Sequence, residues 1–187
     1  MSTLKDLLPI KTERLLLRFL EPGEANLMTA YVKENRQHLQ PWEPLRSERY
    51  YSIEFWQTEI VQIHNEFAAG QSFRLALFSK QSPREPIIGV CNFTNVLRGV
   101  FQACFLGYSV HHKYQGQGVM AEALEAAIPF VFKYLKLHRI MANYMPRNER
   151  SGKLLKKLGF VVEGYARDYL KINNKWEDHI LTSKLAY

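Results

Sequence analysis

The chain has 187 residues, of which 47% are hydrophobic and 23% are charged. These fractions are those of an ordinary globular protein, and they exclude a disordered or fibrous chain. The length fits one domain covering residues 1–187, since domains commonly have roughly 100 to 200 residues. A net charge of +7 favours an anionic partner, such as a phosphorylated cofactor, RNA or an acidic protein. Because the basic residues are scattered, the charge does not choose among these partners.

The sequence has no segment apolar enough to be a membrane span, and residues 1–10 lack the apolar run of a signal peptide. We therefore expect a cytoplasmic protein with no membrane partner. Cys91 and Cys104 lie in apolar, strand-like segments, and we expect two buried free thiols. We expect no metal site, because there is no Cys-x-x-Cys motif and the adjacent side chains of His111 and His112 are expected to diverge.

In chain order, the pattern of apolar residues predicts a strand over residues 14–19 and helices over 24–35 and 51–69. Between these helices, Pro41 and Pro44 are expected to keep residues 39–44 from being helical. Residues 72–78, 87–95 and 100–110 are rich in β-branched and aromatic residues, which predicts three strands. The short connections between them predict antiparallel pairing.

The pattern changes after residue 110. It predicts a loop over residues 111–118, a helix over 119–137, a strand over 139–145 and a helix over 149–158. A strand, a helix and a further strand in this order predict a parallel strand pair. Residues 160–172 and 175–185 then form a hairpin around Asn173 and Asn174. The prediction is a mixed α/β (α+β) fold with a mostly antiparallel sheet of seven strands.

The strongest functional signal is Gln115-Gly116-Gln117-Gly118, directly before the helix predicted at residue 119. A helix N-terminus attracts phosphate through its unpaired N–H groups and its dipole, and glycines leave the approach open. A Walker loop is excluded, because Val119-Met120 follows Gly118 in place of Lys-Ser/Thr.

Two alternative roles of the glycines stay open. The segment Gly116-x-Gly118-x-x-Ala121 matches the dinucleotide-binding fingerprint literally, but residues 111–115 separate it from its strand. The next strand also lacks the acidic residue that binds ribose in that fold. The glycines could alternatively serve only as turn residues with positive φ.

The loop resembles the phosphate-binding motif of the GNAT acetyltransferase superfamily, Gln/Arg-x-x-Gly-x-Gly/Ala, with Met120 in place of the small last residue. Met120 fits such a cradle only if its side chain points into the packing of the helix. Other segments resemble the RimJ/RimL branch of the superfamily, which acetylates N-terminal amines of ribosomal proteins, and most closely its RimJ members. These segments are Thr12-Glu13-Arg14-Leu15-x-Leu17-Arg18, Pro41-Trp42-Glu43-Pro44, Gly89-Val90-x-Asn92-Phe93, Asn143-Tyr144-Met145-Pro146-x-Asn148-x-x-Ser151 and Leu158-Gly159-Phe160-x-x-Glu163-Gly164.

The resemblance implies the GNAT fold, with helices on both faces of the sheet and a splayed central strand pair that holds acetyl-CoA as co-substrate. It also implies a set of cofactor-binding residues. They are Tyr108, Ser109 and Val110 for the pantetheine arm, Gln115, Gly116, Gln117, Gly118, Val119, Met120 and Ala121 for the pyrophosphate, and Asn143, Asn148 and Ser151 near the reacting end.

Direct attack of an amine on the acetyl group needs a neutral amine, a polarised carbonyl and a protonated leaving group. Ser151, one helical turn after Asn148, is predicted to donate a proton to the leaving thiolate. Tyr144 is the second candidate, because Leu155 occupies the position of the Tyr that serves as the acid in many family members. An α-amine has a pKa of about 8, so a weak base suffices. Glu163 is a candidate to hold a water that acts as this base, and a surface carboxylate is the alternative.

The resemblance implies transfer of the acetyl group from acetyl-CoA to the N-terminal alanine of a ribosomal protein, protein five of the small subunit. Contact with the ribosome or its RNA is also expected. Two further functions stay open: acetylation of a small amine or antibiotic, and non-catalytic ribosome or RNA binding on the same scaffold. The second is motivated by the positive charge and by Leu155.

Overall fold

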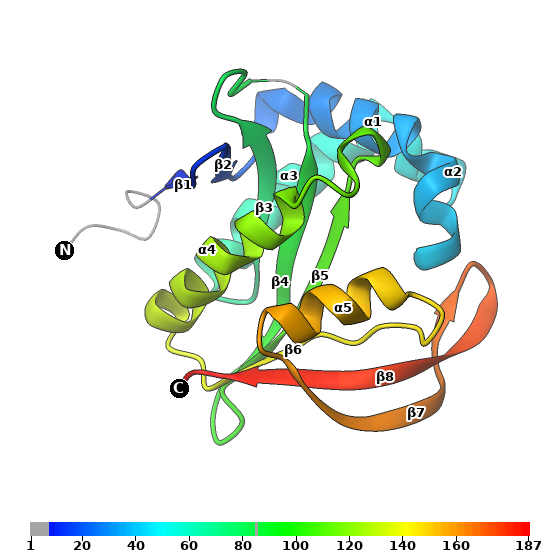
Figure 1. Cartoon of the computed structure of the whole chain (residues 1–187). Helices are drawn as coiled ribbons and strands as arrows, with labels where there is room; N and C mark the ends of the chain where they lie inside the picture. The colour runs from blue at the N-terminus through cyan, green and yellow to red at the C-terminus, as the bar shows by residue number, and fades with distance from the viewer. Residues whose placement is uncertain (1–7, 85) are drawn as a thin grey trace.

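The computed structural model describes residues 8–84 and 86–187, and these form one mixed sheet flanked by helices (Figure 1). The expectation about a signal peptide falls largely on residues 1–7, which lie outside the described residues. The strands are β1 (Ile10–Lys11), β2 (Leu15–Arg18), β3 (Phe73–Ser79), β4 (Gly89–Leu97), β5 (Ala103–Val110), β6 (Arg139–Met141), β7 (Val161–Ile172) and β8 (Lys175–Leu185). The helices are α1 (Ala25–Glu34), α2 (Arg36–Leu39), α3 (Ile53–Ala68), α4 (Val119–Leu135) and α5 (Glu149–Lys157).

The sheet has the order β1-β2-β3-β4-β5-β6-β8-β7, and only the β5–β6 pair is parallel among its described strands. The expectation of a mixed, mostly antiparallel sheet is therefore confirmed. The sheet has eight strands where seven are predicted. The additional strand β1 pairs Ile10 and Lys11 with Leu17 and Leu16, and two residues are too few to show the alternation that identifies a strand.

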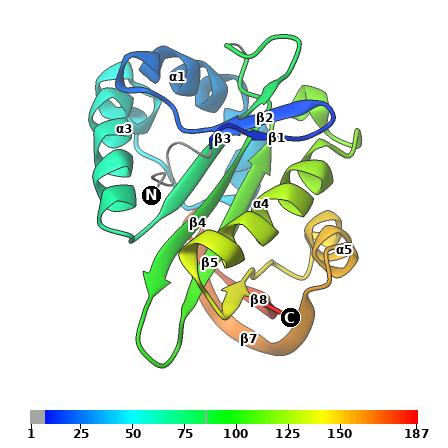
Figure 2. The same cartoon turned by 90° about the vertical axis from the view of Figure 1, so that its left-hand side faces the viewer.

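Helices cover both faces of the sheet, as the resemblance implies (Figure 2). Side chains on β3 alternate between two apolar clusters, because successive residues of a strand point to opposite faces. Leu75 and Leu77 pack in the cluster that contains the buried face of α4, whereas Ala76 and Phe78 pack with Trp56 of α3. The sheet is thus a rigid layer between two cores.

The parallel pair of β5 and β6 is short. Pairing covers Ala103–Phe105 and Arg139–Met141 only, so the strand predicted over residues 139–145 ends early. Beyond it, the Ala142 N–H donates to Thr182 and Tyr144 forms a bridge with Ile180, both on β8. The chain therefore leaves β5 and follows β8, which opens a gap in the sheet.

Three local expectations were wrong. Residues 36–39 form α2 and residues 40–42 form a 3₁₀ turn, because Pro41 stands at the start of that turn, where its missing N–H removes no hydrogen bond. The α4 helix ends at Leu135, since Lys136 adopts a left-handed conformation with φ of 50°. The rings of His111 and His112 stack with centroids 4.5 Å apart, because the chain bends into a 3₁₀ turn at His112.

Cys91 and Cys104 are both buried free thiols, as expected, and burial raises the pKa of each to about 12. Within the described residues, no group of three or more His, Cys, Asp or Glu side chains is placed to hold a metal ion. None of the helices of this part of the chain is long and apolar enough to cross a bilayer.

Candidate active site

A cavity of about 510 Å³ lies in the gap between β5 and the segment that follows β6. One wall is the β5 segment 106–110, and the other is segment 142–145. The glycine loop with the start of α4, the first half of α5, and the segment from His38 to Glu43 complete the lining. The break in strand pairing therefore leaves a cavity that is lined by several elements.

The glycine loop offers a row of backbone donors to this cavity. Gly116 and Gly118 have φ of +72° and +74°, a conformation that glycine adopts without strain. A Cβ atom at Gly116 would meet nothing within 4 Å, so the space beside the loop is open. The N–H groups of residues 116–121 have no acceptor among residues 8–84 and 86–187, as is usual for the first turn of a helix. These unpaired donors suit an anionic group.

Met120 departs from the family motif, and it fits a phosphate cradle only if its side chain points into the packing of the helix. The structure meets this condition. The Met120 side chain is 7% exposed, and its Cε atom would lie 3.3 Å from a Cβ placed on Gly89. The side chain thus points into the packing between α4 and β4. The approach to the loop backbone stays free.

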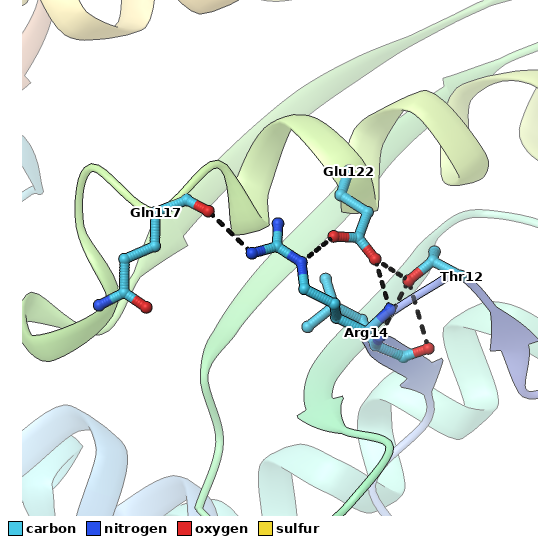
Figure 3. A network of polar contacts seen from close by, with 5 residues as sticks. Thr12, Arg14, Gln117 and Glu122 are labelled. Carbon is cyan, nitrogen blue, oxygen red and sulfur yellow. Dashed lines mark hydrogen bonds and ion pairs between the residues drawn. The ribbon is translucent and has the colours of Figure 1, made fainter.

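A polar network holds the loop against the first strands (Figure 3). The Arg14 Nη1 donates to the Gln117 carbonyl at 3.0 Å, and the Arg14 Nε donates to Glu122 at 2.6 Å. The Thr12 hydroxyl donates to the other Glu122 oxygen at 2.5 Å. Partial burial would raise the pKa of Glu122, but the hydrogen bonds from Thr12 and Arg14 hold it below its ordinary value. The sequence motif that begins with Thr12 does not by itself indicate this network, because Thr12 and Arg14 meet Glu122 only in the folded chain.

The free edge of β5 presents backbone groups of alternate residues to the cavity. The His111 N–H donates to Ile88 next to β4, and successive residues direct their backbone groups to opposite edges. Those of Leu106, Tyr108 and Val110 therefore face the gap. Of the predicted contacts, Tyr108 and Val110 direct their backbone groups to the cavity, where the Val110 backbone also hydrogen-bonds His38. The Ser109 backbone pairs with β4, and its side chain bonds the Tyr31 hydroxyl at 2.8 Å.

Ser151 and Tyr108 form a pair of hydroxyl groups across the cavity. The two oxygens are 2.7 Å apart, and burial raises the pKa of Tyr108 to about 12. Asn148 caps α5 by accepting a hydrogen bond from the Ser151 N–H at 3.2 Å. Leu155 is buried in the core at 1% exposure and does not line the cavity, whereas Tyr108 of β5 does. The sequence did not indicate this side-chain contact of Tyr108.

Asn143 and Tyr144 also line the cavity. The Asn143 side chain donates to the Tyr169 hydroxyl at 3.3 Å and accepts from the Thr182 N–H at 3.3 Å, so it is engaged in joining strands. The Tyr144 ring packs on α5, because a Cβ at Gly152 would lie 2.7 Å from its Cε2 atom.

Glu163 does not line the cavity. Its carboxylate bonds Arg139 at 2.5 Å and the Ser183 hydroxyl at 2.7 Å. These two hydrogen bonds hold the pKa of Glu163 below its ordinary value, which makes it a weaker base. The structure thus separates Glu163 from the residues that it was predicted to join.

Gln115 connects two residues that sequence reasoning missed. Its amide donates to the His38 Nε2 at 2.7 Å and accepts from the Arg150 Nη1 at 2.7 Å. Burial and the charge of Arg150 lower the pKa of His38, whereas its hydrogen bond to the Val110 backbone acts in the opposite direction. No local pattern in the sequence signals His38, because α2 reaches the glycine loop only in the folded chain.

Comparisons with known proteins agree with this geometry. The Acetyltransferase (GNAT) domain family matches residues 14–161. The chain is 47% identical over 174 residues to the [Ribosomal protein uS5]-alanine N-acetyltransferase of Escherichia coli strain K12, covering 93% of this chain and 89% of the relative.

Solved structures are similar as well. The ribosomal-protein-S5-alanine acetyltransferase from Vibrio fischeri superposes with a TM-score of 0.89 at 41% identity, covering 94% of this chain and 95% of that chain. Mycobacterium smegmatis RimJ in complex with CoA-disulfide superposes with a TM-score of 0.84 at 25% identity, covering 92% and 82% respectively.

Proposed function

The chain belongs to the GNAT acetyltransferase family, and we propose that it transfers the acetyl group of acetyl-CoA to the N-terminal alanine of a ribosomal protein, protein five of the small subunit. The observation that supports this most is the single cavity that joins the glycine loop to the Ser151–Tyr108 pair. The name of the 47% identical relative states this acceptor for that protein.

We assign cofactor binding to the glycine loop with the start of α4, to the Gln115–Arg150 pair and to the free edge of β5. The N–H groups of residues 116–121 and the dipole of α4 suit the pyrophosphate, and Gln115 with Arg150 borders them. The free edge of β5 at Tyr108 and Val110 suits an extended arm that bonds like an added strand. Acetyl-CoA supplies an acetyl group already activated as a thioester. Every other requirement of the reaction falls on the chain.

Ser151 is assigned as the proton donor to the leaving sulfur. Tyr108 keeps the Ser151 hydroxyl oriented and, with its raised pKa, stays protonated at neutral pH. Asn148 positions Ser151 through the helix cap. Tyr144, on the same side of the cavity as α5, is the second candidate for the acid. We assign Glu163 no role in the reaction, because it does not line the cavity.

The test is mass spectrometry after incubation with acetyl-CoA and a synthetic peptide that begins with Ala. We expect one added acetyl group, and none on an otherwise identical N-blocked peptide. A panel of aminoglycosides and other small amines tests the alternative acceptor. Turnover on small amines with none on N-terminal peptides would refute the proposed acceptor.

We propose in addition that the enzyme acts as one domain over residues 1–187, in the cytoplasm, and that its positive charge assists contact with the ribosome. The net charge of +7 supports this, because contact with RNA phosphates is driven by cations. Acetylation of protein five within small subunits should then fall more steeply with salt than acetylation of a free peptide. Equal salt dependence would contradict the ribosome contact.

A further inference from the structure

We propose that Glu43 is a catalytic residue that binds the α-ammonium group of the acceptor and takes a proton from it. This inference rests on the proposed function. It assigns the acceptor-binding carboxylate to the segment between α2 and α3, in place of Glu163 on β7.

The charges around the cavity single out Glu43. Among the lining residues in the described part of the chain, Glu43 is the only Asp or Glu. Arg150 and Lys153 of α5 supply positive charge in the same lining. An anionic cofactor suits these cations and the start of α4, whereas a cationic N-terminus needs an anion. Glu43 is the one lining side chain that can provide it.

Glu43 also lies close to β5. Its charge is near enough to add to the burial that raises the pKa of Tyr31. The Tyr31 hydroxyl lies 2.8 Å from the Ser109 Oγ, and Ser109 precedes Val110 on the free edge of β5. Glu43 is thus near the part of β5 that we assign to the extended arm of the cofactor.

The segment that carries Glu43 is held in place by hydrogen bonds from Asn173 and Arg147. The Asn173 N–H, in the β7–β8 turn, donates to the Glu43 carbonyl at 2.9 Å. Arg147 donates to the Pro41 carbonyl at 3.2 Å, pairs with Glu177 at 2.9 Å, and lies over the Trp42 ring at 5.1 Å. A carboxylate fixed in this way suits recognition of one small cationic group.

The electrostatics of Glu43 suit a base. Burial raises the pKa of Glu43, and Arg46 opposes this shift. The Arg46 contact is loose, with Nε and Oε2 3.5 Å apart, and it is the only ion pair of Glu43 within the described residues. Tyr31 and Tyr50 also face this carboxylate, and His38 and His179 line the same cavity. A carboxylate with a raised pKa accepts a proton more readily near neutral pH.

Proton transfer to Glu43 prepares the acceptor nitrogen for attack. One proton moves from that nitrogen to a Glu43 oxygen, which leaves a lone pair on nitrogen for the bond to the acetyl carbon. The carbon–sulfur bond breaks as that bond forms. The second proton lost by nitrogen balances the proton that the sulfur receives through Ser151.

The test compares Glu43→Gln and Glu43→Asp with the control Glu48→Gln. Glu48 belongs to the same region, but its carboxylate is 79% exposed and pairs with Arg36. With the Ala peptide at neutral pH, Glu43→Gln should lower kcat/KM by about 100-fold, the low end for loss of a general base. The defect should shrink above about pH 8, where the free amine becomes neutral without help. The kcat/KM of Glu43→Asp should lie between those of Glu43→Gln and the wild type. The kcat/KM of Glu48→Gln should equal that of the wild type.

Binding of the peptide in the presence of CoA gives a second readout. The wild type should prefer the free N-terminus over the N-acetylated one, and Glu43→Gln should lose that preference while its affinity for CoA is unchanged. Wild-type kcat/KM for Glu43→Gln, or a defect that is the same at all pH values, would overturn the inference. If Glu43→Gln does not fold, the pH profile of Glu43→Asp decides. If the wild type acetylates no peptide, the proposed function fails instead.

Discussion

On the proposed function, the two parts of the cavity would recognise their partners by different means. The glycine-loop part, residues 115–121, offers backbone N–H groups and is bonded to Arg14, the residue before β2. The acceptor part, residues 38–43, uses side chains and is bonded to the β7–β8 turn through Asn173. Recognition by the backbone would tolerate a change of side chain such as Met120, which packs between α4 and β4. Recognition by side chains depends on single functional groups, so substitutions in the two parts should have different effects.

The largest effect is expected at Ser151, which lines the same cavity. Ser151→Ala should lower kcat by about 100-fold or more, since a positioned proton donor contributes that much, with little change in the KM for acetyl-CoA. Steady-state kinetics with the Ala peptide measures both. An unchanged kcat would assign the acid to Tyr144. A wild type without activity on any acceptor would favour the non-catalytic scaffold hypothesis.

The next largest effect is expected from a change of backbone conformation. Gly118→Ala places a Cβ at φ of +74°, which costs roughly 1–2 kcal/mol. We expect about 10-fold weaker binding of CoA by calorimetry. Gly23→Ala is the control, because its added Cβ meets no atom within 4 Å and its φ is not positive. Equal CoA affinity in both variants would refute recognition by the loop backbone.

Tyr108→Phe removes one hydroxyl and keeps the ring. The Ser151 hydroxyl then loses its 2.7 Å partner, and a hydrogen bond of about 1 kcal/mol corresponds to a roughly fivefold lower kcat. The variant should also show no change in CoA affinity. A fall in CoA affinity with kcat retained would mean that Tyr108 acts on the cofactor and not on Ser151.

The smallest effect is expected at Glu122. Glu122→Gln weakens the network of Figure 3, in which Arg14 is half exposed, so we expect a loss below about 1 kcal/mol in unfolding free energy. Because the pKa of Glu122 is held low in the folded chain, its contribution is present above its ordinary pKa and is lost as the pH falls through the folded value. Denaturation at neutral and acid pH should show the two proteins converge in acid.

The same contrast governs what could be predicted from the sequence. The glycine loop is local, so Gly116 and Gly118 stand out in the printed sequence, and strand and helix patterns give most of the sheet. The orientation of the Met120 side chain could be found only in the structure, because its neighbour Gly89 lies on β4, which is distant in sequence from α4. The contact between the Tyr108 and Ser151 hydroxyls could not be predicted, because β5 and α5 meet only in the folded chain.

The acceptor part could not be predicted in this way. Its residues are contiguous at 38–43, but they reach the cavity only in the folded chain, and the prolines around Trp42 suggested an irregular loop where α2 and a 3₁₀ turn form. Glu163 was chosen for its motif, but Arg139 and Ser183 already occupy its carboxylate. A local pattern identifies a residue, and only tertiary contacts show which of its atoms remain available.

The bonds from Asn173 to the acceptor part also bear on how the enzyme is made. Gln40 and Asn173 are 133 residues apart in sequence, and contacts this distant form late because a long loop must close first. A chain still emerging during synthesis can complete the glycine loop and α4 before the β7–β8 turn exists. On the proposed function, the support of the acceptor part is therefore completed last, and shortening the hairpin should give a protein that holds its cofactor but no longer discriminates between amines.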